Sequence, residues 1–313
     1  MMHDAAPRSG IRRVLYGPYG LRAGWRILGF MLLSAGIGIV LASVAAAVGY
    51  AGEMNVSFAI LLVSAVLAGC AMLAFVDRRA PGALGFAAEP AAVRDSAVGL
   101  GVGAAMLGGV VVVLAVASMA RWVADEGTVP EYVAALASSL AFFAVAAAAE
   151  EAMFRGYAFQ ALVQGIGVWP ATLASSALFA YAHGGNTNVT PLALANIFLA
   201  GVMLAVAYLR TRSLWFATAV HLGWNWTMAS LLDFPVSGFP MQMPLYTGVE
   251  TGPDWITGGP FGPEAGVVAS LSIVLGTVWM WRTRRLGESP PMRALRPLVD
   301  DRMPVDPRPE AAS

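Results

Sequence analysis

The chain has 313 residues, of which 58% are hydrophobic and only 12% are charged, and its mean hydropathy is +0.67. Soluble domains carry roughly 25% charged residues, so this composition excludes an ordinary soluble protein and indicates an integral membrane protein. The formal net charge is zero and no basic patch with interleaved aromatic residues occurs, so nucleic acid is not an expected partner.

Apolar runs of about 20 residues, each long enough to cross a hydrocarbon core of about 30 Å, recur along the chain. We predict an all-α, polytopic transmembrane helical bundle with about eight transmembrane helices. The expected spans are residues 25–50, 55–76, 96–120, 133–164, 168–185, 190–209, 213–232 and 264–281. A cytoplasmic N-terminal segment (1–24) precedes the transmembrane domain (25–284), and a disordered cytoplasmic tail (285–313), rich in proline and charge, follows it.

The placement of arginine predicts how the bundle is oriented. Short cytoplasmic loops are enriched in Lys and Arg, and here arginines cluster before the first span and after the second, sixth and eighth spans. We therefore expect both termini in the cytoplasm and the Gly- and Pro-rich loop 233–263 outside. All 19 basic residues are arginine and alanine is abundant, which favours a bacterial cytoplasmic membrane as the location.

The fourth span contains three ionisable residues, Glu150, Glu151 and Arg155. A charged residue inside a span costs at least ~2.5 kcal/mol, so such groups indicate function by default. Glu151 and Arg155 are four residues apart and can form an ion pair on one helix face, which would set helix register. Glu150 points about 100° away from that face and is free to take part in chemistry.

Two further spans carry polar residues at helical spacing. His183 closes the fifth span, and His221 and Asn225 lie four residues apart in the seventh. At 1.5 Å per residue, Glu150, His183 and Asn225 lie roughly 18–21 Å from the expected cytoplasmic ends of their helices, and His221 roughly 12 Å. These side chains should therefore meet at one level, in a site that opens toward the cytoplasmic half.

In order along the chain, these residues spell EExxxR, FxxxH and HxxxN, and residues 133–232 thereby resemble the CPBP family of intramembrane proteases. That family comprises CaaX-processing endopeptidases and bacteriocin-processing or abortive-infection-like membrane proteins. The resemblance implies an endopeptidase in which Glu150 and His183 activate a water while His221 and Asn225 bind the oxyanion. Glu151 and Arg155 would support this site, and the substrate would be a membrane protein or a lipidated peptide.

Whether a metal takes part stays open at this level. Glu150, His183 and His221 would suffice for a catalytic zinc with a free position for water. Against this, the chain has no HExxH spacing and asparagine is a poor zinc ligand. The sequence permits either answer.

Other functions also remain open. The main alternative is a non-enzymatic membrane scaffold or a bacteriocin-immunity-type protein that keeps the motifs and acts by binding. A transporter with a polar relay is disfavoured because no second buried acidic cluster or inverted repeat occurs. HExxH, GxGD and GxSG motifs are all missing, which leaves the glutamate-dependent chemistry among intramembrane proteases.

Overall fold

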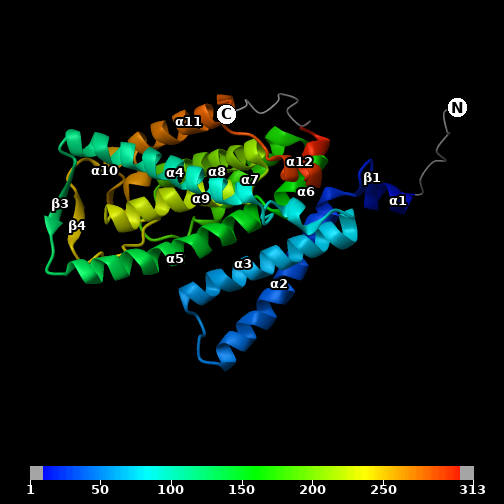
Figure 1. Ribbon diagram of the computed structural model, residues 1–313, viewed down its shortest axis with the longest axis horizontal. Coiled ribbons are helices and arrows are strands. Elements are labelled where there is room, and N and C mark those ends of the chain that lie inside the picture. Colours follow the sequence, from blue (N-terminus) through cyan, green and yellow to red (C-terminus); the bar gives the residue numbers. More distant parts are fainter. Residues whose placement is uncertain (1–9, 304–313) are drawn as a thin grey trace.

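A computed structural model describes residues 10–303 as a bundle of helices that lie along one long axis (Figure 1). The helices are α1 (Gly10–Leu15), α2 (Ala23–Ala47), α3 (Met54–Ala71), α4 (Pro90–Val116), α5 (Val129–Phe154), α6 (Tyr157–Ile166), α7 (Val168–Ala182), α8 (Pro191–Thr211), α9 (Leu214–Trp226), α10 (Asp254–Thr257), α11 (Val267–Arg282) and α12 (Pro290–Leu295). The strands are β1 (Tyr16–Gly17), β2 (Gly20–Leu21), β3 (Ala120–Ala124) and β4 (Tyr246–Glu250). Short 3-10 or π-helical turns connect several of these elements.

The predicted all-α, polytopic bundle is confirmed, and a helix occupies each of the eight expected positions. Five segments of the described chain are long and apolar enough to cross a membrane: α2, α3 with its π-helical extension, α4, α5 with α6, and α8. Helices α7 and α9 have only 15 and 13 residues, fewer than the ~20 that cross a bilayer. His183 is the C-cap residue of α7, and α9 continues directly into a π-helical turn, Thr227–Leu231.

The expected span 133–164 is not one continuous helix. Helix α5 ends at Phe154 and α6 begins at Tyr157, with Gly156 in a non-helical conformation between them. A Cβ atom at Gly156 would lie 2.1 Å from the carbonyl oxygen of Ala152, so only glycine fits this break. The hydropathy of the segment gave no sign of the break, because both helices are apolar.

The helices pack closely where glycines remove side chains. Gly99 and Gly103 of α4 and Gly223 of α9 each lie so near the opposite backbone that a Cβ would come within 2.6 Å of a carbonyl oxygen. Close helix packing is the role expected for the glycine-rich stretch 99–109. Helix α9, which carries His221 and Asn225, is thereby held against α4.

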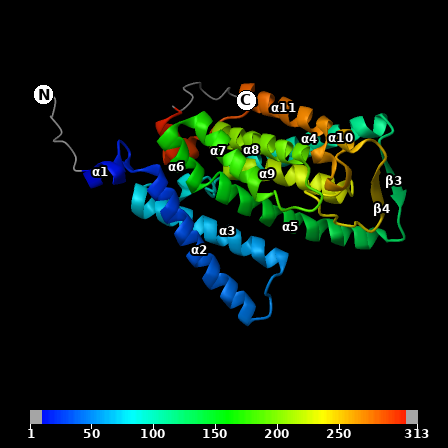
Figure 2. The same ribbon diagram turned by 180° about the vertical axis from the view of Figure 1, so that it is seen from behind.

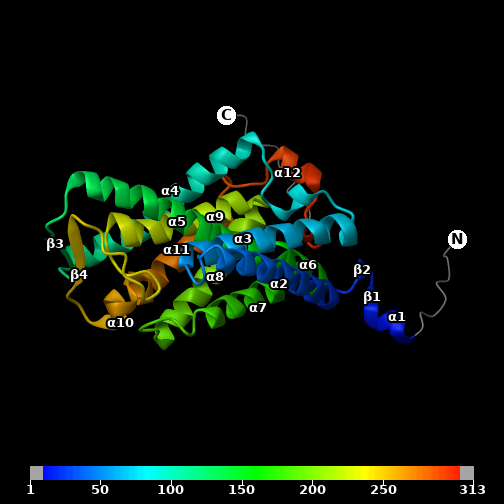
Figure 3. The same ribbon diagram turned by 90° about the horizontal axis from the view of Figure 1, so that it is seen from below.

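A small antiparallel sheet of β3 and β4 joins two of the loops at one end of the bundle, away from α6 and α12 (Figures 1 and 2). Ala120 pairs with Glu250 and Ala124 with Tyr246, so the loop 233–263 is tied to the loop after α4. Neither strand was predicted from the sequence. Viewed from below, α2 and α3 cross the face of the bundle between α4 and α7 (Figure 3).

The C-terminal tail differs from its expected disorder as far as it is described. Helix α12 and the 3-10 turn Leu298–Asp301 are folded, with Leu298 and Val299 fully buried. Asp300 pairs with Arg212 at 2.7 Å, and the backbone N–H of Leu298 donates to the side chain of Gln160. The apolar residues here find a packing site beside α6 that composition alone does not reveal; residues 304–313 lie outside the described part.

Both described ends of the chain lie at the same end of the bundle. The guanidinium of Arg302 stacks on the ring of Tyr19 at 5.4 Å, and the Arg26 side chain donates to Gln164 of α6. The chain therefore passes along the bundle an even number of times.

Candidate active site

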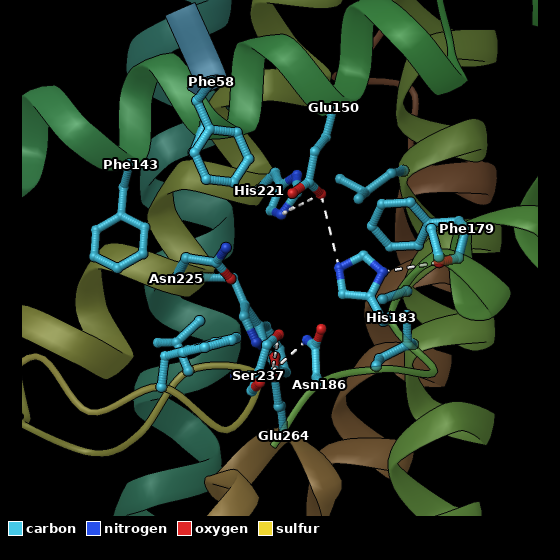
Figure 4. A pocket seen from close by; sticks show the side chains of 18 of the residues that line it. Phe58, Phe143, Glu150, Phe179, His183, Asn186, His221, Asn225, Ser237 and Glu264 are labelled. Carbon is cyan, nitrogen blue, oxygen red and sulfur yellow. Dashed lines mark hydrogen bonds and ion pairs between the residues drawn. The ribbon is translucent and has the colours of Figure 1, made fainter. Parts of the chain in front are cut away.

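A pocket of about 470 Å³ lies inside the bundle, between α3, α5, α7, α8 and α9 and beneath the loop 236–241. One wall is apolar and includes Phe58, Phe142 and Phe143. The predicted polar residues Glu150, His183, His221 and Asn225 all line it, and Figure 4 shows them converging from three helices. The structure thus brings together four residues that are spread over 76 positions of sequence.

Glu150 lies between the two histidines. Its Oε2 atom is 3.9 Å from Nε2 of His183 and 3.9 Å from Nε2 of His221 (Figure 4). The same oxygen is buried and has no hydrogen-bond partner within the described chain. A buried carboxylate oxygen without a partner is costly, so it marks a place where a ligand or water is expected.

Both imidazole rings are oriented through their Nδ1 atoms. Nδ1 of His183 lies 2.8 Å from the carbonyl oxygen of Phe179, and Nδ1 of His221 lies 3.1 Å from Oε1 of Glu151. A carbonyl oxygen can only accept, so Nδ1 of His183 must carry the proton, and an ionised Glu151 imposes the same on His221. Each ring consequently turns its Nε2 atom toward Glu150.

Glu151 and Arg155 form the ion pair that their spacing suggested, at 2.9 Å and with both side chains fully buried. Arg155 also donates to the carbonyl oxygen of Gly201 and lies 4.4 Å over the ring of Phe179. The contact between Glu151 and His221 was not foreseen, because it joins residues that are 70 positions apart. Glu151 therefore orients a ring of the site as well as neutralising Arg155.

The pocket wall also contains three polar residues that were not predicted from the sequence, namely Asn186, Ser237 and Glu264. These residues come from connecting segments that no motif marks. The side chain of Asn196 in α8 donates to the carbonyl oxygens of Glu264 and Gly266 at 2.7 and 2.9 Å. Glu264 is the first residue of the expected span 264–281, and this position was its only signal in the sequence.

The three residues considered for zinc are not arranged as a preformed metal site. In a tetrahedral site with bonds of 2.0–2.2 Å, ligand atoms lie roughly 3.3 Å apart, whereas Glu150 is 3.9 Å from each histidine. Among the residues described, no group of three His, Cys, Asp or Glu side chains is placed to hold a metal ion. Glu150, His183 and His221 as placed therefore do not fit the metal.

The pocket lies toward the end of the bundle that is opposite to the chain termini. Its lining includes Met54 at the start of α3, Asn186 after α7, the loop 236–241 and Glu264 before α11, all of which belong to that end. If the termini are cytoplasmic, as expected, these segments lie on the outer side of the bundle. The depth estimate was made from the helix ends near the termini and could not reveal where the loops close over the site.

The chain is thus a polytopic helical membrane protein in which a glutamate and two histidines meet at one pocket. Residues 132–227 match the family described as type II CAAX prenyl endopeptidase Rce1-like, a match that covers less than half of the chain. This match confirms the resemblance of that segment to the family, which the three motifs had indicated. Neither the curated proteins nor the solved structures gave a match.

Proposed function

We propose that this protein is an intramembrane endopeptidase that hydrolyses peptide bonds of membrane-associated substrates with a water activated by Glu150 and His183. The observation that carries this proposal is the buried, unpartnered Oε2 atom of Glu150, which is equally distant from two histidine nitrogens. The endopeptidase family of the core supports hydrolysis as the reaction class. The pocket is large enough for a peptide segment and has an apolar wall for its side chains.

In the proposed reaction, Glu150 removes a proton from the water while Nε2 of His183 accepts the second hydrogen bond of that water. The resulting hydroxide attacks the carbonyl carbon of the scissile bond. Glu150 then delivers its proton to the departing amine, so that the products are a carboxylic acid and an amine. A carboxylate in a partly dry pocket can serve in turn as base and acid.

His221 and Asn225 are proposed to stabilise the oxyanion. Because Nδ1–H of His221 donates to Glu151, its Nε2 can donate only when the ring is the doubly protonated imidazolium. Since Glu151 already neutralises Arg155, the nearby carboxylate of Glu150 would balance that positive charge. The side-chain amide of Asn225 is a donor in every protonation state, and donors aimed at a developing oxyanion supply a large part of catalysis.

A membrane scaffold or an immunity-type protein remains the alternative function. A scaffold needs no ligand-sized pocket, whereas Glu150, both histidines and Asn225 line a pocket of about 470 Å³. This difference favours the enzyme. No step of the proposed reaction is assigned to a metal.

The proposal is tested by cleavage of membrane peptides with purified protein and with the variants Glu150→Gln and His221→Ala. We expect each variant to lose activity by about 100-fold or more, the usual contribution of a general base or an oxyanion donor. Glu126→Gln, which removes an exposed carboxylate from the loop before α5, is the matched control and should keep full activity. Equal activity in all four proteins would refute the proposal.

The same assay addresses the metal question. We expect activity to survive dialysis against a strong chelator, because the three residues as placed do not form a metal site. Loss of activity that added zinc restores would replace this mechanism with a metal-dependent one.

A further inference from the structure

The pocket contains a second carboxylate, Glu264, that lies outside all three motifs and outside the matched segment 132–227. It sits between the loop 233–263 and α11, at the edge of the membrane-spanning region. Figure 4 shows its side chain reaching into the pocket from the side opposite to Glu150. The proposed reaction does not use it.

Hydrogen bonds fix both the backbone and the side chain of Glu264. The side chain of Asn196, which is 2% exposed, holds the carbonyl oxygens of Glu264 and Gly266, and Ser270 donates to Asn196 at 2.6 Å. The carboxylate itself accepts from both the backbone N–H and the hydroxyl of Ser237, at 2.7 and 2.9 Å. Both hydrogen bonds go to Oε1, so the carboxylate is held in one orientation.

The loop that carries Ser237 is itself firmly attached. Asn186 donates to the carbonyl oxygen of Ser237 at 3.1 Å, and Gly238 donates to that of Phe261 at 2.9 Å. A Cβ at Gly238 would lie 2.0 Å from the carbonyl oxygen of Thr187, so the three segments are in backbone contact. This network makes the wall around Glu264 a rigid part of the pocket.

Glu264 keeps accessible surface although its neighbours Pro263 and Ala265 are buried, and that surface faces the pocket it lines. No arginine or lysine belongs to the pocket lining within the described chain. A carboxylate in such surroundings gains most from a cationic ligand that forms a charge-assisted hydrogen bond.

We propose that Glu264 forms a cation-binding subsite of this pocket, which takes a protonated amine or a guanidinium group of the bound peptide. Opposite the subsite, the phenylalanine wall would take an apolar part of the same peptide. The inference deepens the proposed function, because it names a substrate class for the same pocket. A peptide with a basic residue close to an apolar stretch fits both walls.

The test separates binding from cleavage. A fluorescent apolar peptide with an acetylated N-terminus is made with lysine, arginine or norleucine at each position in turn. A second series of the same peptides has a free N-terminus. Binding to the Glu150→Gln protein is measured first, and cleavage by the unsubstituted protein second. We expect one position at which the basic peptide binds about tenfold or more tighter than the norleucine peptide, a ratio typical of a hydrogen bond to a charged group.

Variants identify the residue responsible. Glu264→Gln keeps an oxygen that can accept from Ser237 but removes the charge, so we expect the ratio of basic to norleucine binding to fall to about one. Ser237→Ala keeps the charge, and Glu126→Gln removes an exposed carboxylate elsewhere; both should retain a clear preference.

A preference that survives Glu264→Gln would overturn the inference. Lack of any preference in proteins with Glu264 intact would overturn it as well, without relying on the folding of a variant. If only the peptides with a free N-terminus bind tightly, the ligand is the terminal amine. Failure of every peptide to be cleaved would refute the endopeptidase proposal, while the binding ratios would still decide on the subsite.

Discussion

At the scale of residues, two adjacent glutamates occupy very different environments. The side chain of Glu151 is fully buried and contacts Arg155 and His221, whereas that of Glu150 is 19% exposed, toward the pocket. Consecutive helix positions point about 100° apart, which is why neighbours in sequence can face a structural network and a cavity. The two carboxylates therefore have different roles: Glu151 belongs to a buried ionic network and Glu150 faces the pocket.

We expect Glu151→Gln to reduce stability more than Glu150→Gln, and Glu150→Gln to reduce cleavage more. Removing the charge of Glu151 leaves the fully buried Arg155 without its ionic partner, which typically costs about 3–5 kcal/mol. Unfolding temperature and cleavage rate, measured on the same preparations, check both halves of this prediction. The opposite order in either measurement would contradict the assigned division of roles.

At the scale of elements, the position of α9 depends on its contact with α4. The glycines Gly99 and Gly103 allow the two backbones to approach, and the atoms nearest to Gly103 are the carbonyl oxygen of Val220 and the amide nitrogen of Trp224. Val220 directly precedes His221 in the sequence, and Trp224 directly precedes Asn225. Small residues at this contact therefore set the geometry of the site from outside it.

Gly103→Ala should destabilise the protein and weaken cleavage, because its Cβ would lie 2.1 Å from the carbonyl oxygen of Val220. Overpacking of this kind costs about 1–3 kcal/mol. Gly101→Ala is the matched control: it lies on the same helix, and its Cβ would meet nothing within 4 Å. Thermal unfolding of the two variants should differ clearly, and equal stabilities would show that the α4–α9 contact is not tight.

At the scale of the whole molecule, orientation in the membrane is linked to access to the site. Both described ends of the chain lie at one end of the bundle, and the loops that line the pocket lie toward the other. The arginine distribution favours cytoplasmic termini. If that orientation holds, the loops that line the pocket lie on the outer side of the membrane.

Cysteine labelling tests the orientation. Cys70 is the only cysteine, so Cys70→Ala gives a background in which Glu126→Cys and Arg284→Cys can each be introduced alone. We expect a membrane-impermeant maleimide to label the cysteine at position 126 in intact cells, and that at position 284 only after permeabilisation. The reverse pattern would place the termini outside and the pocket loops toward the cytoplasm.

Much of the fold and site could be predicted from sequence because the signals are local. Apolar runs predicted eight positions, and each of them is helical. A spacing of four residues placed Glu151 beside Arg155, and His221 in line with Asn225. Polar residues in otherwise apolar helices marked the pocket, because burying them without a function is costly. The break at Gly156 and the folded tail were missed, since neither changes the average hydropathy or composition.

The sequence by itself determined that this is a polytopic helical membrane protein with a glutamate and histidine site, because hydropathy and helical period are properties of short segments. Only the tertiary structure decided that Glu151 orients His221, that Glu264 joins the pocket and that the loops close over it from the end opposite to the termini. The contacts of Glu151 with His221 and of Glu264 with Ser237 join residues 70 and 27 positions apart. No local pattern encodes them, because they depend on how whole helices and loops pack against one another.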